Sequence, residues 1–237
     1  MIRDLTELLR KAKNRPIRKM AVAAAEDEHV LKALQDAMKE GIIIPLLVGD
    51  KEKIQRMAQP IGFSLDDIEL IDNREGAAVS ARIAVSKVKN GEADIIMKGF
   101  VGTGDLLKAV LDKDIGLRTD QLLSHVAFFE SPYYHKIFCV TDVAMNIAPD
   151  LEAKVQIIHN AVKACQGIGI GNPKVAVAAA VETVNPKMEA TVHAALLKEM
   201  NARGEVKGCV VDGPFAIDIA VTLRTLVDFR EKLSALS

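Results

Sequence analysis

Short apolar runs alternate with helix-like segments along the first half of the chain. The runs cover residues 19–25, 42–48, 68–71 and 95–97, and apolar side chains recur between them at helical spacing. Strands that are apolar on both faces are typical of parallel sheets that helices cover on either side. The alternation therefore predicts an α/β protein with mainly parallel sheets, in which ligands bind beyond the carboxyl ends of the strands.

A hairpin is predicted near the middle of the chain. Leu122–Phe129 and Lys136–Val140 are strand-like, and the short turn between them contains Pro132. We take this antiparallel element as the seam between two domains. The first α/β domain is predicted over residues 1–127 and the second over residues 128–221.

The last residues, 222–237, form an atypical tail. Leucines and a valine near helical spacing predict an amphipathic helix over residues 225–235. Thr225, followed three residues later by Asp228, resembles a capping pair at the start of that helix.

A glycine-rich turn follows the predicted strand at 95–97. Gly99, Gly102 and Gly104 allow close approach of the backbone, Thr103 is the expected N-cap of the next helix, and Lys98 supplies a positive charge. Free N–H groups at a helix N-terminus form a ready anion site. The alternative is that these glycines serve packing alone. The order of glycines matches neither the P-loop nor the dinucleotide fingerprint.

Acidic and amide side chains follow two later strands. Asp142 and Asn146 lie between a predicted strand and the helix that Asp150 is expected to cap. Asp212 opens a predicted Asp-Gly-Pro turn after a strand, and Asp218 follows it. These side chains either face a ligand cleft or only order their turns, since Asp and Asn favour turns on their own.

The composition excludes several classes of function. The 237 residues contain 31 Lys and Arg against 32 Asp and Glu, and this balance produces no field that attracts nucleic acid or a membrane. Aromatic residues make up 4% with no Trp, and no apolar run approaches membrane-spanning length. The three cysteines lack metal spacing, which favours small buried hydrophobes in a reducing cytoplasm. His125 and His135 are either a metal pair or, as we expect, hydrogen-bonded histidines.

Several motifs together resemble those of the phosphate acyltransferases, and most closely the phosphate butyryltransferase branch. The resemblance runs from the first residue to about Val221. It is carried by Lys98-Gly99-x-x-Gly102-Thr103-Gly104-Asp105, Gly116-Leu117-Arg118-Thr119, Leu123-Ser124-His125-Val126, Thr141-Asp142-x-x-x-Asn146-x-x-Pro149 and Asp212-Gly213-Pro214-x-x-x-Asp218.

The resemblance implies transfer of a short-chain acyl group between coenzyme A and inorganic phosphate. It implies a two-domain fold similar to that of the isocitrate and isopropylmalate dehydrogenases, and a homo-oligomer, a dimer or larger. Coenzyme A and phosphate are then substrates, with no further cofactor and no metal. The residues implied to bind phosphate or coenzyme A are Lys98, Gly99, Gly102, Thr103, Arg118, Ser124, His125, Asp142, Asn146, Asp212 and Asp218.

The chemistry requires two anions to meet and an oxyanion to be stabilised. Arg118 offers a bidentate fork, Lys98 a point charge, and Ser124 or His125 a hydrogen bond. The catalytic base stays unassigned.

The tail departs from the family pattern. The family continues beyond the Asp-Gly-Pro motif to a Ser-Arg pair and an Asp regarded as catalytic, and residues 222–237 match neither. We therefore expect a folded, ligand-binding protein whose turnover is absent or far below that of the family. The alternatives are a family member that only binds coenzyme A or acyl phosphate, and an NAD-dependent decarboxylating dehydrogenase of similar fold.

Overall fold

The computed structural model describes residues 2–221, which form two compact units. One unit comprises Leu9–Asp120, and the other comprises the described residues up to Leu8 together with those from Gln121 onward. The division falls a few residues before the predicted boundary, and the first residues of the chain join the second unit. The predicted helix within residues 222–237 lies outside the described residues.

The Leu9–Asp120 unit contains a parallel sheet in the strand order β3–β2–β1–β4. Its strands are β1 (Arg18–Ala23), β2 (Ile43–Gly49), β3 (Glu69–Asp72) and β4 (Ile95–Lys98). Met20 of β1 pairs with Pro45 of β2 on one side and with Ile95 of β4 on the other. The predicted parallel α/β architecture is confirmed.

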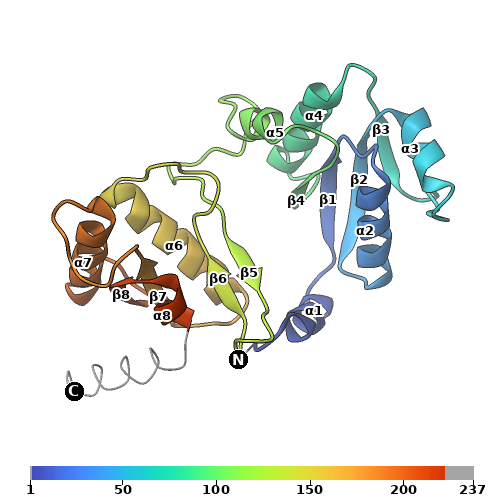
Figure 1. Cartoon of the computed structure of the whole chain (residues 1–237). Helices are drawn as coiled ribbons and strands as arrows, with labels where there is room; N and C mark the ends of the chain where they lie inside the picture. Colours follow the sequence, from blue (N-terminus) through green and yellow to red (C-terminus); the bar gives the residue numbers. More distant parts are fainter. Residues whose placement is uncertain (1, 222–237) are drawn as a thin grey trace. The chain divides into compact units, whose positions relative to one another are not determined.

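Helices cover both faces of this sheet (Figure 1). They are α2 (Glu28–Lys39) and α3 (Lys51–Ala58) on one face, and α4 (Ala77–Lys89) and α5 (Thr103–Val110) on the other. Successive side chains of a strand point to opposite faces. Val22 of β1 therefore packs with Leu31 and Leu34 of α2, whereas Ala23 packs with Val85 of α4. Each fully buried leucine of this kind stabilises the fold by about 2 kcal/mol.

Aspartate side chains cap the N-termini of three helices. The Asp27 carboxylate accepts from the Val30 N–H at 2.9 Å at the start of α2, and Asp50 accepts from the Lys53 N–H at 3.1 Å at the start of α3. Asp150 caps α6 (Leu151–Gly167) by accepting from the Ala153 N–H at 2.8 Å. The predicted cap at Asp150 is confirmed, and each of these caps contributes about 1 kcal/mol.

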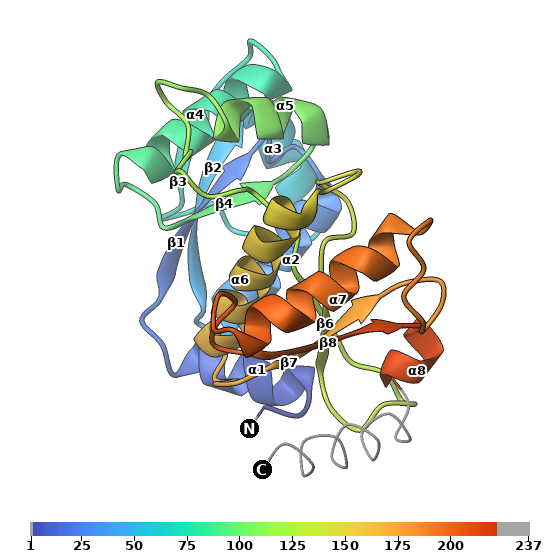
Figure 2. The ribbon, with the colours of Figure 1, turned by 90° about the vertical axis from the view of Figure 1, so that its left-hand side faces the viewer.

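The second unit contains two strand pairs. The antiparallel pair β5 (Ala127–Phe129) and β6 (Phe138–Val140) confirms the predicted hairpin, but residues 122–126 and 136–137, also predicted as strand, lie outside it. Strand β7 (Lys174–Ala178) pairs in parallel with β8 (Val210–Phe215). Helices α6 and α7 (Glu189–Ala202) pack on the second pair (Figure 2).

The core of this unit combines Ile158 and Val162 of α6, Leu197 of α7 and Val211 of β8. The remaining helices are α1 (Leu5–Lys13), which crosses the division between the units, and α8 (Ile217–Val221). In the described part of the chain, no helix is long and apolar enough to cross a lipid bilayer.

The turn predicted at Asp212-Gly213-Pro214 is wrong, because β8 runs on through these residues to Phe215. Gly213 adopts a φ of +154°, and a β-carbon there would lie 2.7 Å from the Val177 carbonyl oxygen of β7. Close approach of the two strands therefore requires this glycine, which the sequence pattern indicated only as turn chemistry.

Candidate functional site

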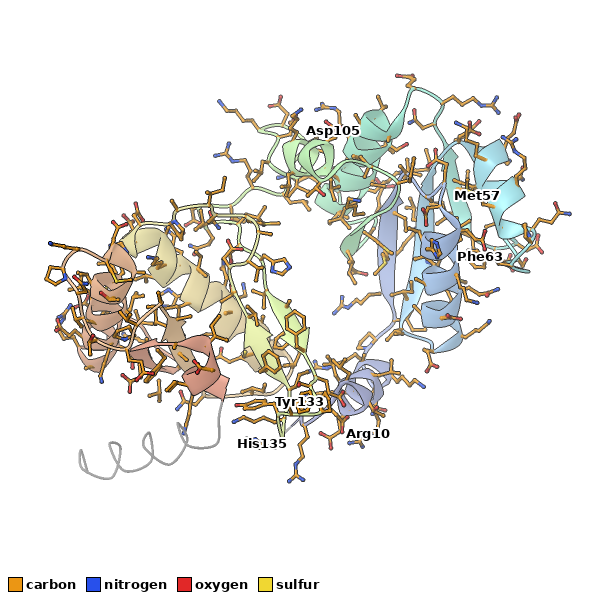
Figure 3. The ribbon with its side chains drawn as sticks, viewed as in Figure 1. Arg10, Met57, Phe63, Asp105, Tyr133 and His135 are labelled. Atoms are coloured by element: carbon orange, nitrogen blue, oxygen red, sulfur yellow. The ribbon has the colours of Figure 1, made fainter. Side chains whose placement is uncertain are left out.

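The carboxyl ends of the neighbouring strands β1 and β4 form a topological switch point in the Leu9–Asp120 unit. After β1 the chain continues in α2 on one face of the sheet, whereas after β4 it continues in α5 on the other face. Open α/β sheets bind ligands where the connections diverge in this way. The glycine turn of residues 98–105 leaves the sheet at this point, and Asp105 at the start of α5 is labelled in Figure 3.

Gly99 is buried against the backbone that follows β1. Its N–H donates to the Ala23 carbonyl at 2.9 Å, and the next N–H, of Phe100, donates to the Ala24 carbonyl at 2.6 Å. A β-carbon on Gly99 would lie 2.1 Å from the Ala24 carbonyl oxygen, a distance too short for any side chain to be accommodated without moving the backbone. Gly99 therefore serves packing, as the alternative interpretation of the glycine turn proposed, because the close contact between the segments after β1 and β4 leaves no room for a side chain.

Replacing Gly99 by alanine is expected to lower the free energy of unfolding by about 3 kcal/mol, because backbone atoms must move to admit the methyl group. Gly104→Ala is the matched control, since a β-carbon at Gly104 has no neighbour within 4 Å. Loss of unfolded-state freedom should make that control neutral or slightly stabilising. Urea unfolding of both variants measures the difference, and equal stabilities would contradict the packing role of Gly99.

The first residue of α5 is Thr103, so Gly102 is the N-cap. The predicted cap at Thr103 is therefore wrong, and no side chain caps this helix. Gly102, Thr103 and Gly104 are exposed, and among the described residues no group accepts a hydrogen bond from the N–H of Thr103 or Gly104. Unpaired N–H groups at the positive end of a helix are suited to an anion, as the sequence predicted.

Lys98 is the last residue of β4 and is exposed. Its Nζ donates to the Gly99 carbonyl at 3.4 Å and, in the described part of the chain, forms no ion pair. This ammonium group is therefore available to a ligand at the turn that follows β4.

Arg118 ends a tight turn after α5. Asp112 holds the turn by accepting from the N–H groups of Asp114 (2.9 Å) and Ile115 (3.1 Å) and from Arg82 (2.8 Å). These bonds, led by that from Ile115, lower the pKa of Asp112 to about 2, so its carboxylate stays charged. Gly116 is buried within the turn, where a β-carbon would lie 2.3 Å from the Asp112 carbonyl oxygen.

The Arg118 side chain itself is exposed. Within residues 2–221 no hydrogen bond or ion pair engages its guanidinium group. A structural arginine is normally held by carboxylates or carbonyl groups, so this unengaged fork is consistent with the predicted contact to phosphate.

In the second unit, side chains hold an irregular segment just before β5, residues 122–125. The N–H of His125 donates to Asp142 Oδ1 at 3.2 Å, and the His125 carbonyl accepts from Thr141 Oγ1 at 2.6 Å. Asn146 Nδ2 donates to the Leu123 carbonyl at 3.1 Å. The predicted residues Ser124, His125, Asp142 and Asn146 therefore come together in one cluster.

Asp142 is the centre of this cluster. Its carboxylate accepts from the N–H groups of His125, Ala144, Met145 and Asn146, and also from the Asn146 side chain. Burial acts to raise the pKa of Asp142, but these hydrogen bonds together outweigh it and lower that pKa. Asp142 thus orders the turn around it, as one of the two alternatives from the sequence proposed. Through these hydrogen bonds it also positions Ser124 and His125.

Two residues of α6 that the sequence analysis did not single out complete the support. Gln156 Oε1 accepts from the Leu122 N–H at 2.9 Å, and Asn160 Nδ2 donates to the Leu122 carbonyl at 2.8 Å and to Ser124 Oγ at 2.8 Å. The available signal was a pair of amide side chains four residues apart, on one face of a largely apolar helix.

Asp212 and Asp218 are not joined to this cluster by hydrogen bonds. Asp212 is buried within β8 and forms an ion pair with Lys198 of α7 at 2.7 Å, while its Oδ1 also accepts from the Gly213 N–H at 2.9 Å. Asp218 is exposed on α8. Asp212 therefore has structural partners of its own, and the ligand role predicted for both residues stays a prediction.

The two histidines considered as a metal pair lie at opposite ends of the β5–β6 hairpin. His135 is exposed in the turn beside Tyr133 (Figure 3), and its ring lies 4.9 Å from that of Tyr134. His125 precedes β5, and its Nδ1 is buried without a hydrogen-bond partner. The described residues contain no group of three or more side chains placed to hold a metal ion.

The three cysteines were expected to be small buried hydrophobes. Cys165 and Cys209 are buried, but Cys139 of β6 is only partly buried. The neighbouring Cys165 thiol of α6, together with burial, raises the pKa of Cys139. The expectation of a buried side chain is therefore confirmed for Cys165 and Cys209 and wrong for Cys139.

Comparisons with known proteins agree with these motifs. The family described as phosphate acetyl/butaryl transferase matches two overlapping segments, residues 4–83 and 77–228. A phosphate butyryltransferase of Clostridium acetobutylicum is 46% identical over 222 residues, which make up 94% of this chain and 73% of that relative. A phosphate acetyltransferase of Thermotoga maritima is 42% identical over 205 residues, 86% of this chain and 69% of the relative.

A solved structure gives the same result. The branched-chain phosphotransacylase of Enterococcus faecalis aligns with a TM-score of 0.73 and 28% identity, covering 90% of this chain and 74% of that one. The predicted resemblance is thus confirmed, and the chain belongs to the family of phosphate acetyltransferases and butyryltransferases.

Proposed function

We propose that this protein transfers a short-chain acyl group between coenzyme A and inorganic phosphate. The observation that carries the proposal is its 46% identity to a phosphate butyryltransferase over 94% of the chain. The family match also favours acyl transfer over the dehydrogenase alternative.

The reaction needs positioning more than covalent help from the protein. A phosphate oxygen attacks the thioester carbonyl, a tetrahedral oxyanion forms, and its collapse releases the coenzyme A thiolate and the acyl phosphate. Groups that donate hydrogen bonds to the developing oxyanion and to phosphate lower the barrier. The structure offers such donors in the N–H groups at the start of α5, in Lys98 and Arg118, and in the segment that carries Ser124 and His125.

The proposal extends to the setting of the enzyme. We propose a homo-oligomeric protein of the cytoplasm that uses coenzyme A and phosphate as substrates, with no separate cofactor. Light scattering of the purified protein measures its assembly state.

The test is phosphate-dependent release of free thiol from butyryl-CoA by the purified, sequence-verified chain. Arg118→Lys keeps the charge but loses the bidentate fork, so the KM for phosphate should rise about tenfold while the KM for butyryl-CoA changes little. Arg56→Lys is the matched control, because within residues 2–221 the Arg56 guanidinium has a single hydrogen bond, which it donates to the Glu52 carbonyl at 3.4 Å. If the chain binds coenzyme A but releases no thiol, the result would instead support the alternative hypothesis of a family member that only binds its ligands, which the sequence of the tail favours.

A further inference from the structure

Asn160 contacts the candidate site from the third turn of α6. Its Nδ2 lies 2.8 Å from the Leu122 carbonyl oxygen and 2.8 Å from Ser124 Oγ. Both hydrogens of the amide are therefore used, one on the backbone and one on a side chain of the segment 122–125.

The Leu122 carbonyl determines which way the Asn160 amide faces. A carbonyl oxygen can only accept, so the amide must turn its NH₂ group and not its oxygen toward Leu122. The same NH₂ group then donates to Ser124 Oγ, which must accept. The hydroxyl proton of Ser124 consequently points away from Asn160, and no acceptor for it exists among the described residues.

The backbone around Ser124 has little freedom. Gln156 holds the Leu122 N–H at 2.9 Å, Asn146 holds the Leu123 carbonyl at 3.1 Å, and Asp142 holds the His125 N–H at 3.2 Å. Asn160 restricts the direction of the Ser124 hydroxyl, because the Ser124 oxygen accepts from Asn160 Nδ2 and its proton must point elsewhere.

We propose that Asn160 is a positioning residue that presents the Ser124 hydroxyl as a hydrogen-bond donor to the phosphate substrate. This inference rests on the proposed function, since it assigns the donor to a substrate of that reaction. An anion offers only acceptors, so a serine whose oxygen already accepts from the protein has its proton directed away from that donor and loses less rotational freedom when it binds phosphate.

The experiment is a double-mutant cycle on inorganic phosphate binding, measured by calorimetry with Ser124→Ala, Asn160→Ala and the double variant. Loss of one charge-assisted hydrogen bond should raise the phosphate Kd about tenfold in each single variant. The double variant should bind no more weakly than Ser124→Ala, because Asn160 acts through Ser124. The affinity for coenzyme A should stay near that of the wild type.

Gln156→Ala is the matched control. This substitution removes the other α6 amide that holds Leu122, and among the described residues Gln156 has no hydrogen bond to Ser124. A purely structural role predicts that Gln156→Ala and Asn160→Ala weaken phosphate binding equally, and that result would overturn the proposal. Additive effects in the double variant would overturn it as well. Asn160→Asp is a second, nearly isosteric variant. Its carboxylate accepts a hydrogen bond from the Ser124 hydroxyl and so turns the proton away from the ligand. Phosphate affinity should therefore fall at least as far as in Asn160→Ala.

Phosphate binding and thiol release by the wild-type chain test this inference and the proposed function separately. A wild-type chain that binds phosphate with the pattern above but releases no thiol would refute acyl transfer and leave the role of Asn160 supported. A wild-type chain that binds no phosphate would overturn the role of Asn160.

Discussion

Gly102→Val is expected to abolish binding of phosphate and coenzyme A while leaving the Leu9–Asp120 unit folded. Gly102 is an exposed N-cap with a φ of −61° and a ψ of 137°, which valine adopts readily. The nearest atom to a β-carbon there is Asp105 Oδ2 at 3.6 Å, an ordinary contact. The isopropyl group then stands beside the unpaired N–H groups of Thr103 and Gly104, which an anion must approach to about 2.9 Å.

Loss of two charge-assisted hydrogen bonds should raise the Kd for coenzyme A more than a hundredfold in calorimetric titration. Gly171→Val is the matched control, since Gly171 is exposed, has no neighbour within 4 Å of a β-carbon and lies in the other unit. Unchanged affinity in Gly102→Val, with a normal unfolding temperature, would show that the anion site lies elsewhere.

The glycine turn shows how far sequence reasoning reaches. The pattern located a strand, a turn and a helix correctly, because apolar runs and helical spacing are local properties. It could not tell which glycine serves packing and which serves a ligand. Gly99 is fixed by its distance to the Ala24 carbonyl oxygen, and this contact joins strands far apart in the sequence.

Helix caps could also be predicted from the sequence, and the wrong predictions concerned the exact ends of helices and strands. Asp150 was identified as a cap because an N-cap side chain bonds to the N–H group three residues ahead. Thr103 was identified as a cap although the helix begins at that residue, an error of one position. Asp212 was placed in a turn because Asp-Gly-Pro is turn chemistry, whereas pairing with β7 extends the strand through it.

The support of Ser124 could not be predicted from the sequence. Leu122 and Gln156 are 34 residues apart, and Ser124 and Asn160 are 36 apart. In the sequence, Gln156 and Asn160 are ordinary polar residues of an amphipathic helix. Only the fold shows that they face an irregular segment whose backbone groups lack partners in a sheet, and which side chains must therefore satisfy.

Asp142→Asn is expected to lower kcat/KM for acyl transfer at least a hundredfold. The carboxylate of Asp142 accepts from four backbone N–H groups and from the Asn146 side chain, and an amide has only one oxygen to offer them. Whichever way the amide turns, its NH₂ group faces donors, and Ser124 and His125 lose their fixed positions. A displacement of about 1 Å at a reacting group costs on the order of a hundredfold in rate.

The same substitution should lower the free energy of unfolding by about 2 kcal/mol at neutral pH. The pKa of Asp142 is lower in the folded chain than the value of about 3.9 in an unfolded one, so its stabilisation is complete above about pH 5. That stabilisation disappears as the pH falls through the folded pKa. The difference in unfolding free energy between the wild type and Asp142→Asn should therefore shrink as acid is added.

Asp150→Asn provides the control, because asparagine caps a helix about as well as aspartate. It lies in the same unit and makes the same change of charge, so its activity and neutral-pH stability should stay close to those of the wild type. Denaturant unfolding of the three proteins between pH 7 and about pH 3 measures the predicted convergence. If Asp142→Asn keeps full activity, or if its stability deficit persists unchanged in acid, the carboxylate does not order the segment that carries Ser124 and His125.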